Sequence, residues 1–215
     1  TLTLYNDFRY QLSDRTVGTL TYRNAEVSGD GAVTDSTNHY ILAGLDHRFN
    51  EKSTGVIRAG AQVRDVENGS SGNNPYVEGS FRTAVNSQFS LRSYVRYGVE
   101  DFARNVFNLN TGVNAFYSNN DTLRIGVTGT YTLSEDLSLS GGINYASLDY
   151  NDLYVSTFGL GAASVDEELL NAFVGVNLRV TDNVFVNARY NFEDLTSDAG
   201  RSYDRNRFSL GASTQ

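Results

Sequence analysis

The chain has 215 residues, enough for one all-β domain, and it contains no cysteine, which excludes disulfides, thiolate catalysis and cysteine-based metal sites. Its 25 acidic residues outnumber its 17 basic ones, and the resulting net charge of -8 argues against the exposed cationic surface that nucleic-acid binding requires. No run of 18 apolar residues occurs, which excludes a transmembrane helix, whereas 20 glycines, one proline and 12% aromatic residues favour strands joined by tight turns.

Apolar and polar residues alternate along almost the whole chain, in units of about a dozen residues separated by turn-forming clusters. A period of two is typical of strands, because successive side chains of a strand point to opposite faces of the sheet. We therefore predict an all-β chain with about twelve strands, within a range of 11 to 14. The predicted strands are residues 1–12, 16–28, 38–49, 54–66, 75–85, 89–100, 106–117, 122–133, 137–149, 168–180, 183–193 and 204–213.

The strand predicted at 54–66 illustrates the two faces. Ile57 and Ala61 lie on one face, and Arg58 and Gln62 lie on the other. A soluble β-sandwich would bury the apolar face and expose the arginines to water, whereas a transmembrane barrel places the apolar face in lipid and the polar face around an interior. One strand does not distinguish the two folds.

The distribution of arginine distinguishes them. Lys52 is the only lysine, and twelve of the arginines fall on the polar face of their predicted strand, while the other four lie in predicted turns or loops. The twelve are Arg9, Arg23, Arg48, Arg58, Arg64, Arg82, Arg92, Arg96, Arg124, Arg179, Arg189 and Arg207. A solvated sheet surface would carry lysine and glutamate as well, so this segregation favours an arginine-lined lumen. The sequence therefore predicts an antiparallel transmembrane β-barrel, with a soluble β-sandwich as the second alternative.

The lengths of strands and connections agree with a barrel. Sandwich strands typically have five or six residues, whereas a tilted transmembrane strand needs roughly 9 to 11. Tyrosine and phenylalanine recur near the predicted strand ends, as they do in interfacial aromatic belts. Short connections such as 13–15 and 50–53 alternate with longer ones such as 29–37, 67–74 and 193–204. This alternation predicts short periplasmic turns and longer extracellular loops.

The alternation fails at one place. Residues 118–121 and 134–136 both predict short turns, so either residues 153–161 form a further strand or residues 104–121 form one long external loop. Both solutions give an odd number of strands beginning with one that runs toward the periplasm, whereas a closed bacterial barrel normally has an even number. We therefore expect residues 1–215 to be a single barrel domain that is the C-terminal portion of a longer barrel, with a complete twelve-stranded barrel as the alternative.

Three segments resemble the repeated hairpins of Gram-negative outer-membrane β-barrels. They are HYILAGLDHRFNEKSTGVIRAGAQVR at 39–64, YTLSEDLSLSGGINYASLDY at 131–150 and YNFEDLTSDAGRSYDRNRFSLGAS at 190–213. The closing YDRNRFSLGAS strand is most similar to a beta-barrel porin family of uncharacterised outer-membrane proteins. The resemblance concerns the residue pattern and the spacing of the hairpins, and it includes no catalytic motif. It implies an outer-membrane location and a pore or structural role.

The strongest candidate site is a ladder of polar side chains on the inward faces of consecutive predicted strands. In a porin, such a ladder narrows the lumen and attracts anions through a focused positive potential. In the alternative, Glu78 and the neighbouring arginines satisfy one another and rigidify the wall. The predicted lumen-lining residues are Arg58, Gln62, Arg64, Glu78, Arg82, Arg92, Arg96 and Arg124.

We expect no enzymatic activity, no metal site and no cofactor. The two histidines, His39 and His47, are eight residues apart on one predicted strand, which separates them by roughly 26 Å, too far to share a metal or to form a catalytic pair. Acidic clusters in the predicted loops lack the spacing of a dedicated calcium loop, so we interpret them as solvated loops bridged by divalent ions to lipopolysaccharide. They are Asp149 and Asp152; Asp166, Glu167 and Glu168; and Glu193, Asp194 and Asp198.

These observations predict an outer-membrane β-barrel protein of a Gram-negative bacterium that acts as a porin-like passive channel for small solutes. The alternative is a structural or interaction barrel with a closed lumen. The expected partners are outer-membrane lipid and lipopolysaccharide, with a protein partner or a second copy of the chain as further candidates, and no nucleic acid. Because the arginines of the ladder outnumber Glu78, the predicted channel prefers anions.

Overall fold

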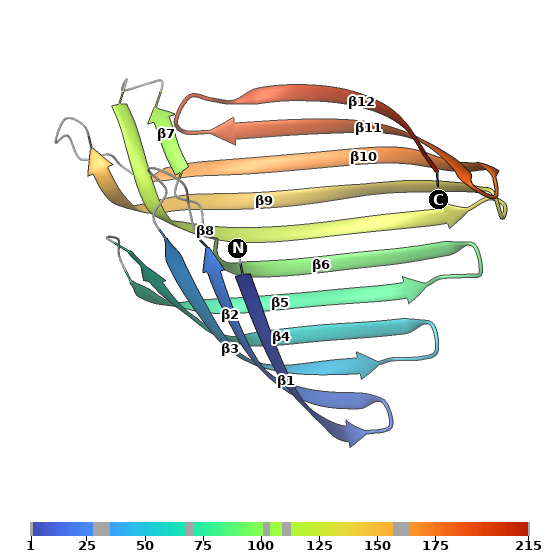
Figure 1. The fold of residues 1–215 in the computed structure, drawn as a ribbon, viewed down its shortest axis with the longest axis horizontal. Helices are drawn as coiled ribbons and strands as arrows, with labels where there is room; N and C mark the ends of the chain where they lie inside the picture. Colours follow the sequence, from blue (N-terminus) through green and yellow to red (C-terminus); the bar gives the residue numbers. More distant parts are fainter. Residues whose placement is uncertain are drawn as a thin grey trace.

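The computed structural model describes residues 2–27, 35–67, 71–100, 104–108, 113–156 and 164–214. These residues form twelve β-strands (Figure 1). The strands are β1 (Leu2–Ser13), β2 (Thr16–Val27), β3 (Ser36–Arg48), β4 (Ser53–Val66), β5 (Gly72–Ala84), β6 (Phe89–Val99), β7 (Arg104–Asn108), β8 (Val113–Thr132), β9 (Leu137–Ser156), β10 (Val165–Thr181), β11 (Val184–Ser197) and β12 (Tyr203–Thr214). Within these ranges, no helix is long and apolar enough to cross a membrane.

All strands belong to one antiparallel sheet, in which strands that follow one another along the chain also pair. The order is β1-β2-β3-β4-β5-β6-β8-β9-β10-β11-β12, and the short β7 pairs only with β8, beside this path. The sheet curls so that one face is concave, and short turns gather at one end of it (Figure 1). β1 and β12 form the two edges; both run toward the short-turn end, and their described residues do not pair with each other.

The prediction of two separate strands at 106–117 and 122–133 is wrong. β8 continues from Val113 to Thr132, and residues 118–121, which were expected to form a turn, lie inside it. β9 pairs with β8 along this extension, so backbone hydrogen bonds to a neighbouring strand override the local turn preference of a Ser-Asn-Asn-Asp sequence.

Neither solution for the broken alternation is correct in detail. Residues 153–156 end β9 and do not begin a further strand, and residues 157–161 lie outside the described part of the chain. Residues 104–121 are not one long loop, because β7 and the first part of β8 occupy most of them. The eleven strands of the main path are nevertheless an odd number, as both solutions required.

Several strands extend into the predicted loops. β5 begins at Gly72 and β11 ends at Ser197, so the connections predicted at 67–74 and 193–204 shorten to 67–71 and 198–202. Most residues of the predicted acidic loop clusters, such as Asp149 and Asp166, consequently lie in strands, and Asp198 is the member that stays in a connection. The interpretation of these clusters as solvated loops is therefore wrong for the members within β9, β10 and β11. Pairing with a long neighbour stabilises a strand beyond the point at which its apolar pattern ends.

Burial in this sheet is inverted relative to a water-soluble protein. Asn38, Gln62 and Asn120 are fully buried, whereas Val174 in the middle of β10 is 53% exposed and Phe208 in β12 is 71% exposed. Soluble folds bury apolar side chains and leave polar ones in water. A sheet whose outer face contacts lipid has the opposite requirement, so the exposed apolar face is the lipid-facing surface of a transmembrane barrel fold.

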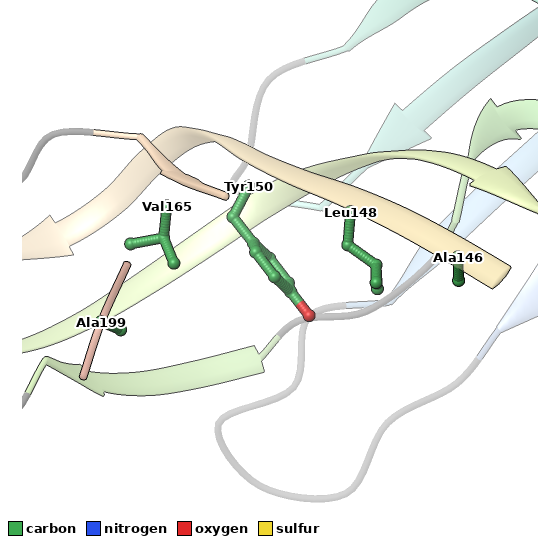
Figure 2. Packing of buried hydrophobic residues seen from close by; sticks show 5 residues of the cluster. All are labelled: Ala146, Leu148, Tyr150, Val165 and Ala199. Atoms are coloured by element: carbon green, nitrogen blue, oxygen red, sulfur yellow. The ribbon is translucent and has the colours of Figure 1, made fainter. Parts of the chain in front are cut away.

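A small apolar cluster lies on the concave, inner face, far from the short turns. Leu148 and Tyr150 of β9 lie beside Val165 of β10, and Ala199 of the β11–β12 connection packs against them (Figure 2). Tyr150 is 1% exposed and Ala199 is fully buried. The β11–β12 connection therefore folds over the inner face at this end of the sheet.

Aromatic rings of the inner face lie across glycines of the neighbouring strand. A Cβ atom at Gly98 would lie 2.5 Å from Cδ2 of Tyr76, and one at Gly126 would lie 2.4 Å from Cε1 of Tyr94. Any other residue at these two positions would displace a ring. Glycine thus permits large side chains to lie flat against the inner wall.

Candidate functional site

The register of the sheet assigns every predicted arginine to a face, because residues directly opposite one another on paired strands share a face. All twelve arginines predicted on polar faces lie on the inner face, the one that carries Gln62. Arg205, which was counted with the arginines of turns and loops although the predicted strand 204–213 includes it, also lies on this face in β12. It pairs with Glu193, with 2.6 Å between Nη2 and Oε1. The inner face is therefore the candidate functional surface.

Four of the predicted lumen residues form one row across β4, β5, β6 and β8. They are Arg58, Glu78, Arg96 and Arg124. The Nη2 atom of Arg58 lies 3.4 Å from Oδ1 of Asp46, and its Nη1 atom lies 3.7 Å from Oε1 of Glu78. Opposite charges on neighbouring strands stabilise a sheet, so Arg58 is part of a neutralised wall.

Glu100, just beyond the end of β6, pairs with the other two arginines of this row. It accepts hydrogen bonds from Nε and Nη2 of Arg124 at 2.8 and 2.7 Å, and Nη2 of Arg96 pairs with the same carboxylate. Burial raises the pKa of the Glu100 carboxyl, but the hydrogen bonds from the two arginines outweigh it and hold that pKa below its ordinary value. The sequence analysis missed Glu100, although its spacing of four residues from Arg96 places both on one face of an extended chain.

Gln62 joins three strands and belongs to the packed wall. Its Nε2 atom lies 2.9 Å from Oδ1 of Asn38 and 2.8 Å from the carbonyl oxygen of Val99, and its Oε1 atom accepts a hydrogen bond from the Val99 N–H at 3.0 Å. Gln62 in β4 therefore reaches over β5 to the end of β6. Arg64, two residues along β4, is also buried, at 3% exposure. Both residues face inward as predicted, but neither is open to solvent.

A different row of the inner face contains four arginines and no acidic residue. We call it the basic row, and in strand order it consists of Arg48, Thr54, Arg82, Arg92, Thr128, Gly142, Phe173, Asn191 and Arg207. Arg82 and Arg92 are directly opposite each other, and all four arginines are exposed. Among the described residues, none of the four forms an ion pair with a carboxylate. The predicted ladder thus contains arginines that pair with carboxylates, Arg58, Arg96 and Arg124, and arginines without a carboxylate partner among the described residues, Arg82 and Arg92.

Arg23 forms a third arrangement, which the sequence analysis did not single out. Its guanidinium carbon lies 3.8 Å from the centroid of the Tyr40 ring and 5.1 Å from that of Tyr76. The two rings meet edge to face, with 5.0 Å between their centroids. The Tyr76 hydroxyl donates to Oε2 of Glu78 at 2.8 Å. Tyrosines 36 residues apart in sequence share this contact only because β3, β4 and β5 pair, so no local signal could have revealed it.

Glu167 was predicted in a solvated acidic loop, and that interpretation is wrong. It lies in β10 on the inner face, 2% exposed, where it accepts a hydrogen bond from Oγ of Ser197 at 2.7 Å and pairs with Nε of Arg201. Burial alone would lower the pKa of the Arg201 guanidinium, but the hydrogen bond to Glu167 outweighs it and raises that pKa. This buried pair holds the β11–β12 connection against the wall.

The histidines occupy the opposite, outer face of β3. His39 Nδ1 lies 2.9 Å from the Tyr22 hydroxyl, and His47 Nδ1 lies 2.8 Å from Oγ1 of Thr16. In the part of the chain that the structure describes, no group of three or more His, Cys, Asp or Glu side chains is arranged to hold a metal ion.

Known proteins are similar to this chain in fold alone. No family model matches it, and no curated protein matches it significantly. Among solved structures, the loop L8 deletion mutant of OmpT, an outer membrane protein of Vibrio cholerae, is similar over 97% of this chain and 61% of its own, with 16% identity and a TM-score of 0.55. In-vitro folded OmpT gives 15% identity and a TM-score of 0.53 over 98% of this chain and 64% of its own. FpvA of P. aeruginosa, solved in a complex with Pvd and Fe, gives 11% identity and a TM-score of 0.59 over 98% and 38%.

This chain therefore spans less than two thirds of the length of these proteins. At such low identity, the similarity establishes architecture and no shared chemistry. One antiparallel sheet with long strands, an inverted pattern of burial and these similarities together identify the fold as that of the outer-membrane β-barrels.

Proposed function

We propose that the protein is a passive pore for small solutes in the bacterial outer membrane, with a preference for anions. The basic row carries this proposal, because it places four exposed guanidinium groups on the inner face with no carboxylate in the same row. Charges that line a confined lumen determine which ions pass more strongly than the net charge of the whole chain. The apolar outer face then contacts lipid and lipopolysaccharide, and the protein has no enzymatic activity.

The pore is tested by recording currents from the full-length protein in planar lipid bilayers. We expect discrete conductance steps and, in a potassium chloride gradient, a reversal potential with the sign of chloride preference. Steps that are absent over a range of voltages would reject the pore. A reversal potential with the sign of potassium preference would reject anion selection by the basic row, but the proposal of a pore would stand.

A pore also needs a closed wall, and we propose that further strands of the full-length protein complete it between β1 and β12. Both edge strands run toward the short-turn end, so they cannot pair directly in an antiparallel barrel. An odd number of intervening strands would restore antiparallel pairing at both edges. The long, exposed β1 edge is otherwise a site for uncontrolled pairing with other chains.

Hydrogen exchange of the full-length protein tests this closure. In an antiparallel edge strand, alternate backbone N–H groups point away from the single neighbour, so an open β1 edge would exchange rapidly at every second residue. We expect slow exchange at all β1 amides, comparable to that of β5, which is paired on both sides. A pattern of alternating fast and slow exchange in β1, with uniformly slow exchange in β5, would contradict the proposal.

The second candidate is a structural or interaction barrel with a closed lumen. The observation that favours it is the packing of the inner face away from the short turns, where Gln62, Tyr40 and Tyr150 are buried against their neighbours. In this case the loops or a protein partner use the barrel as a scaffold. Protein that is folded in bilayers but conducts no ions would support this candidate over the pore.

A further inference from the structure

The inner face holds a cavity of about 460 Å³ away from the basic row, whose wall includes Thr3 of β1, Arg23 of β2, Tyr40 of β3, Arg96 of β6 and Arg124 of β8. We propose that this cavity binds the carboxylate group of a small anionic solute, with Arg23 as the primary donor. The proposal deepens the pore function and rests on it for the route by which a solute arrives. The volume of the cavity is within the usual range of sites for small molecules, roughly 300 to 1,000 Å³.

Arg23 is positioned for such a ligand. Its guanidinium lies 3.8 Å from the centroid of the Tyr40 ring, and a guanidinium stacked on a ring keeps its in-plane N–H groups available for a carboxylate. The nearest carboxylate oxygen, on Glu78, is 4.0 Å from Nη1, which is too long for a hydrogen bond. Within the described residues, the donors of Arg23 thus have no carboxylate at hydrogen-bond distance, although the side chain is only 18% exposed.

On the opposite side of the cavity, both arginines already have a carboxylate partner. Arg124 donates two hydrogen bonds to Glu100, and Arg96 pairs with the same carboxylate. Glu100 therefore fixes these two arginines and does not compete for Arg23. The two arginines carry two positive charges and Glu100 carries one negative charge. The remaining positive charge would also attract a carboxylate bound at Arg23.

The charges that line the cavity favour an anion. Three guanidinium groups, those of Arg23, Arg96 and Arg124, and one carboxylate, that of Glu100, line it, which leaves two net positive charges. A bound carboxylate compensates part of this charge, whereas a neutral sugar compensates none. The charged groups thus distinguish an anionic solute from a neutral one of similar size.

Isothermal titration calorimetry on the full-length protein in detergent tests the site without any need for conduction. The probe is sodium gluconate, with glucose as the neutral analogue and inorganic phosphate as the competing oxyanion. We expect binding of gluconate, no heat from glucose, and displacement of gluconate by phosphate, because both oxyanions accept hydrogen bonds from a guanidinium group. Absence of gluconate binding, or equal binding of glucose, would overturn the proposal.

Two variants assign the binding to Arg23. Arg23→Met keeps an unbranched stem but removes the charge, and we expect it to weaken gluconate binding at least tenfold. Arg9→Met is the matched control, because Arg9 lies on the same face but pairs with Asp46 at 2.7 Å and does not line the cavity, so it should bind gluconate normally. If Arg23→Met does not fold, Arg23→Lys replaces it and should bind more weakly than the native protein, because an ammonium lacks the planar donor geometry.

Unchanged affinity in a folded Arg23 variant, or an equal loss in Arg9→Met, would overturn the assignment. The pore and the site can fail separately. If gluconate binding depends on Arg23 but the protein shows no bilayer conductance, the pore is rejected and the site is retained. If the protein conducts ions but does not bind gluconate, the site is rejected and the pore is retained.

Discussion

Replacing Arg82 and Arg92 together by alanine is expected to lower the chloride-to-potassium permeability ratio of the pore by about tenfold. The two guanidinium groups are directly opposite each other on β5 and β6, and within the described residues neither has a carboxylate partner. A unit charge about 6 Å from a passing ion in water contributes about 0.7 kcal/mol, and screening at about 0.1 M salt reduces this to roughly 0.4 kcal/mol. Two such charges favour chloride and disfavour potassium by about 0.8 kcal/mol each, so the ratio changes by about 1.5 kcal/mol, close to a factor of ten. Reversal potentials in a potassium chloride gradient measure the ratio.

Two further variants distinguish charge from shape. Arg82→Lys with Arg92→Lys keeps both charges and should retain the native ratio, whereas Arg82→Glu with Arg92→Glu should reverse the preference toward potassium. An unaltered ratio in the double alanine variant would mean that these arginines belong to the wall and do not select ions. Arg58 is unsuitable for this test, because removing it would leave the carboxylates of Asp46 and Glu78 uncompensated.

Gln62→Leu is expected to lower the free energy of unfolding by about 3 to 5 kcal/mol. The substitution preserves the approximate volume but removes the hydrogen bonds to Asn38 and to both backbone groups of Val99. Each buried polar group left without a partner costs about 1 to 3 kcal/mol. Urea titration of the full-length protein in lipid vesicles, followed by tyrosine fluorescence, measures the loss.

Gln11→Leu is the matched control for this variant. Gln11 also faces inward, but it is exposed on β1 and none of its side-chain atoms forms a hydrogen bond with the described residues. We expect a change within about 0.5 kcal/mol, as for most exposed substitutions. Similar losses in both variants would show that Gln62 does not have the bridging role that its contacts with β3 and β6 indicate.

Together, the two experiments separate the two roles of the inner face. Loss of selectivity without loss of stability is expected at Arg82 and Arg92, and loss of stability is expected at Gln62. The inner face thus combines an exposed, charged row with a packed and hydrogen-bonded region, and the proposals of a pore and of a closed scaffold each rest on one of them.

The sequence by itself determined the fold class and the face of each strand. Alternation with a period of two requires opposite faces, so the inward position of Arg58, Arg82 and Arg124 could be predicted from spacing alone. Because arginine occurs on one face only, the sequence also predicted that polar side chains are buried and apolar ones are exposed. Gln62 is buried and Val174 is exposed. These properties are local, because each depends on neighbours within a few residues.

Tertiary structure alone decided which side chains meet. Glu100 neutralises Arg124 from a distance of 24 residues, and Gln62 bonds Val99 from 37 residues away. It also decided that residues 118–121 continue a strand, because β9 supplies hydrogen-bond partners that no local turn signal reveals. The register between strands sets all three outcomes. Strand register is the alignment of paired strands along one another. Composition and alternation decide which residues share a face, but alignments that differ by two residues keep the same faces, so the sequence pattern does not choose among them.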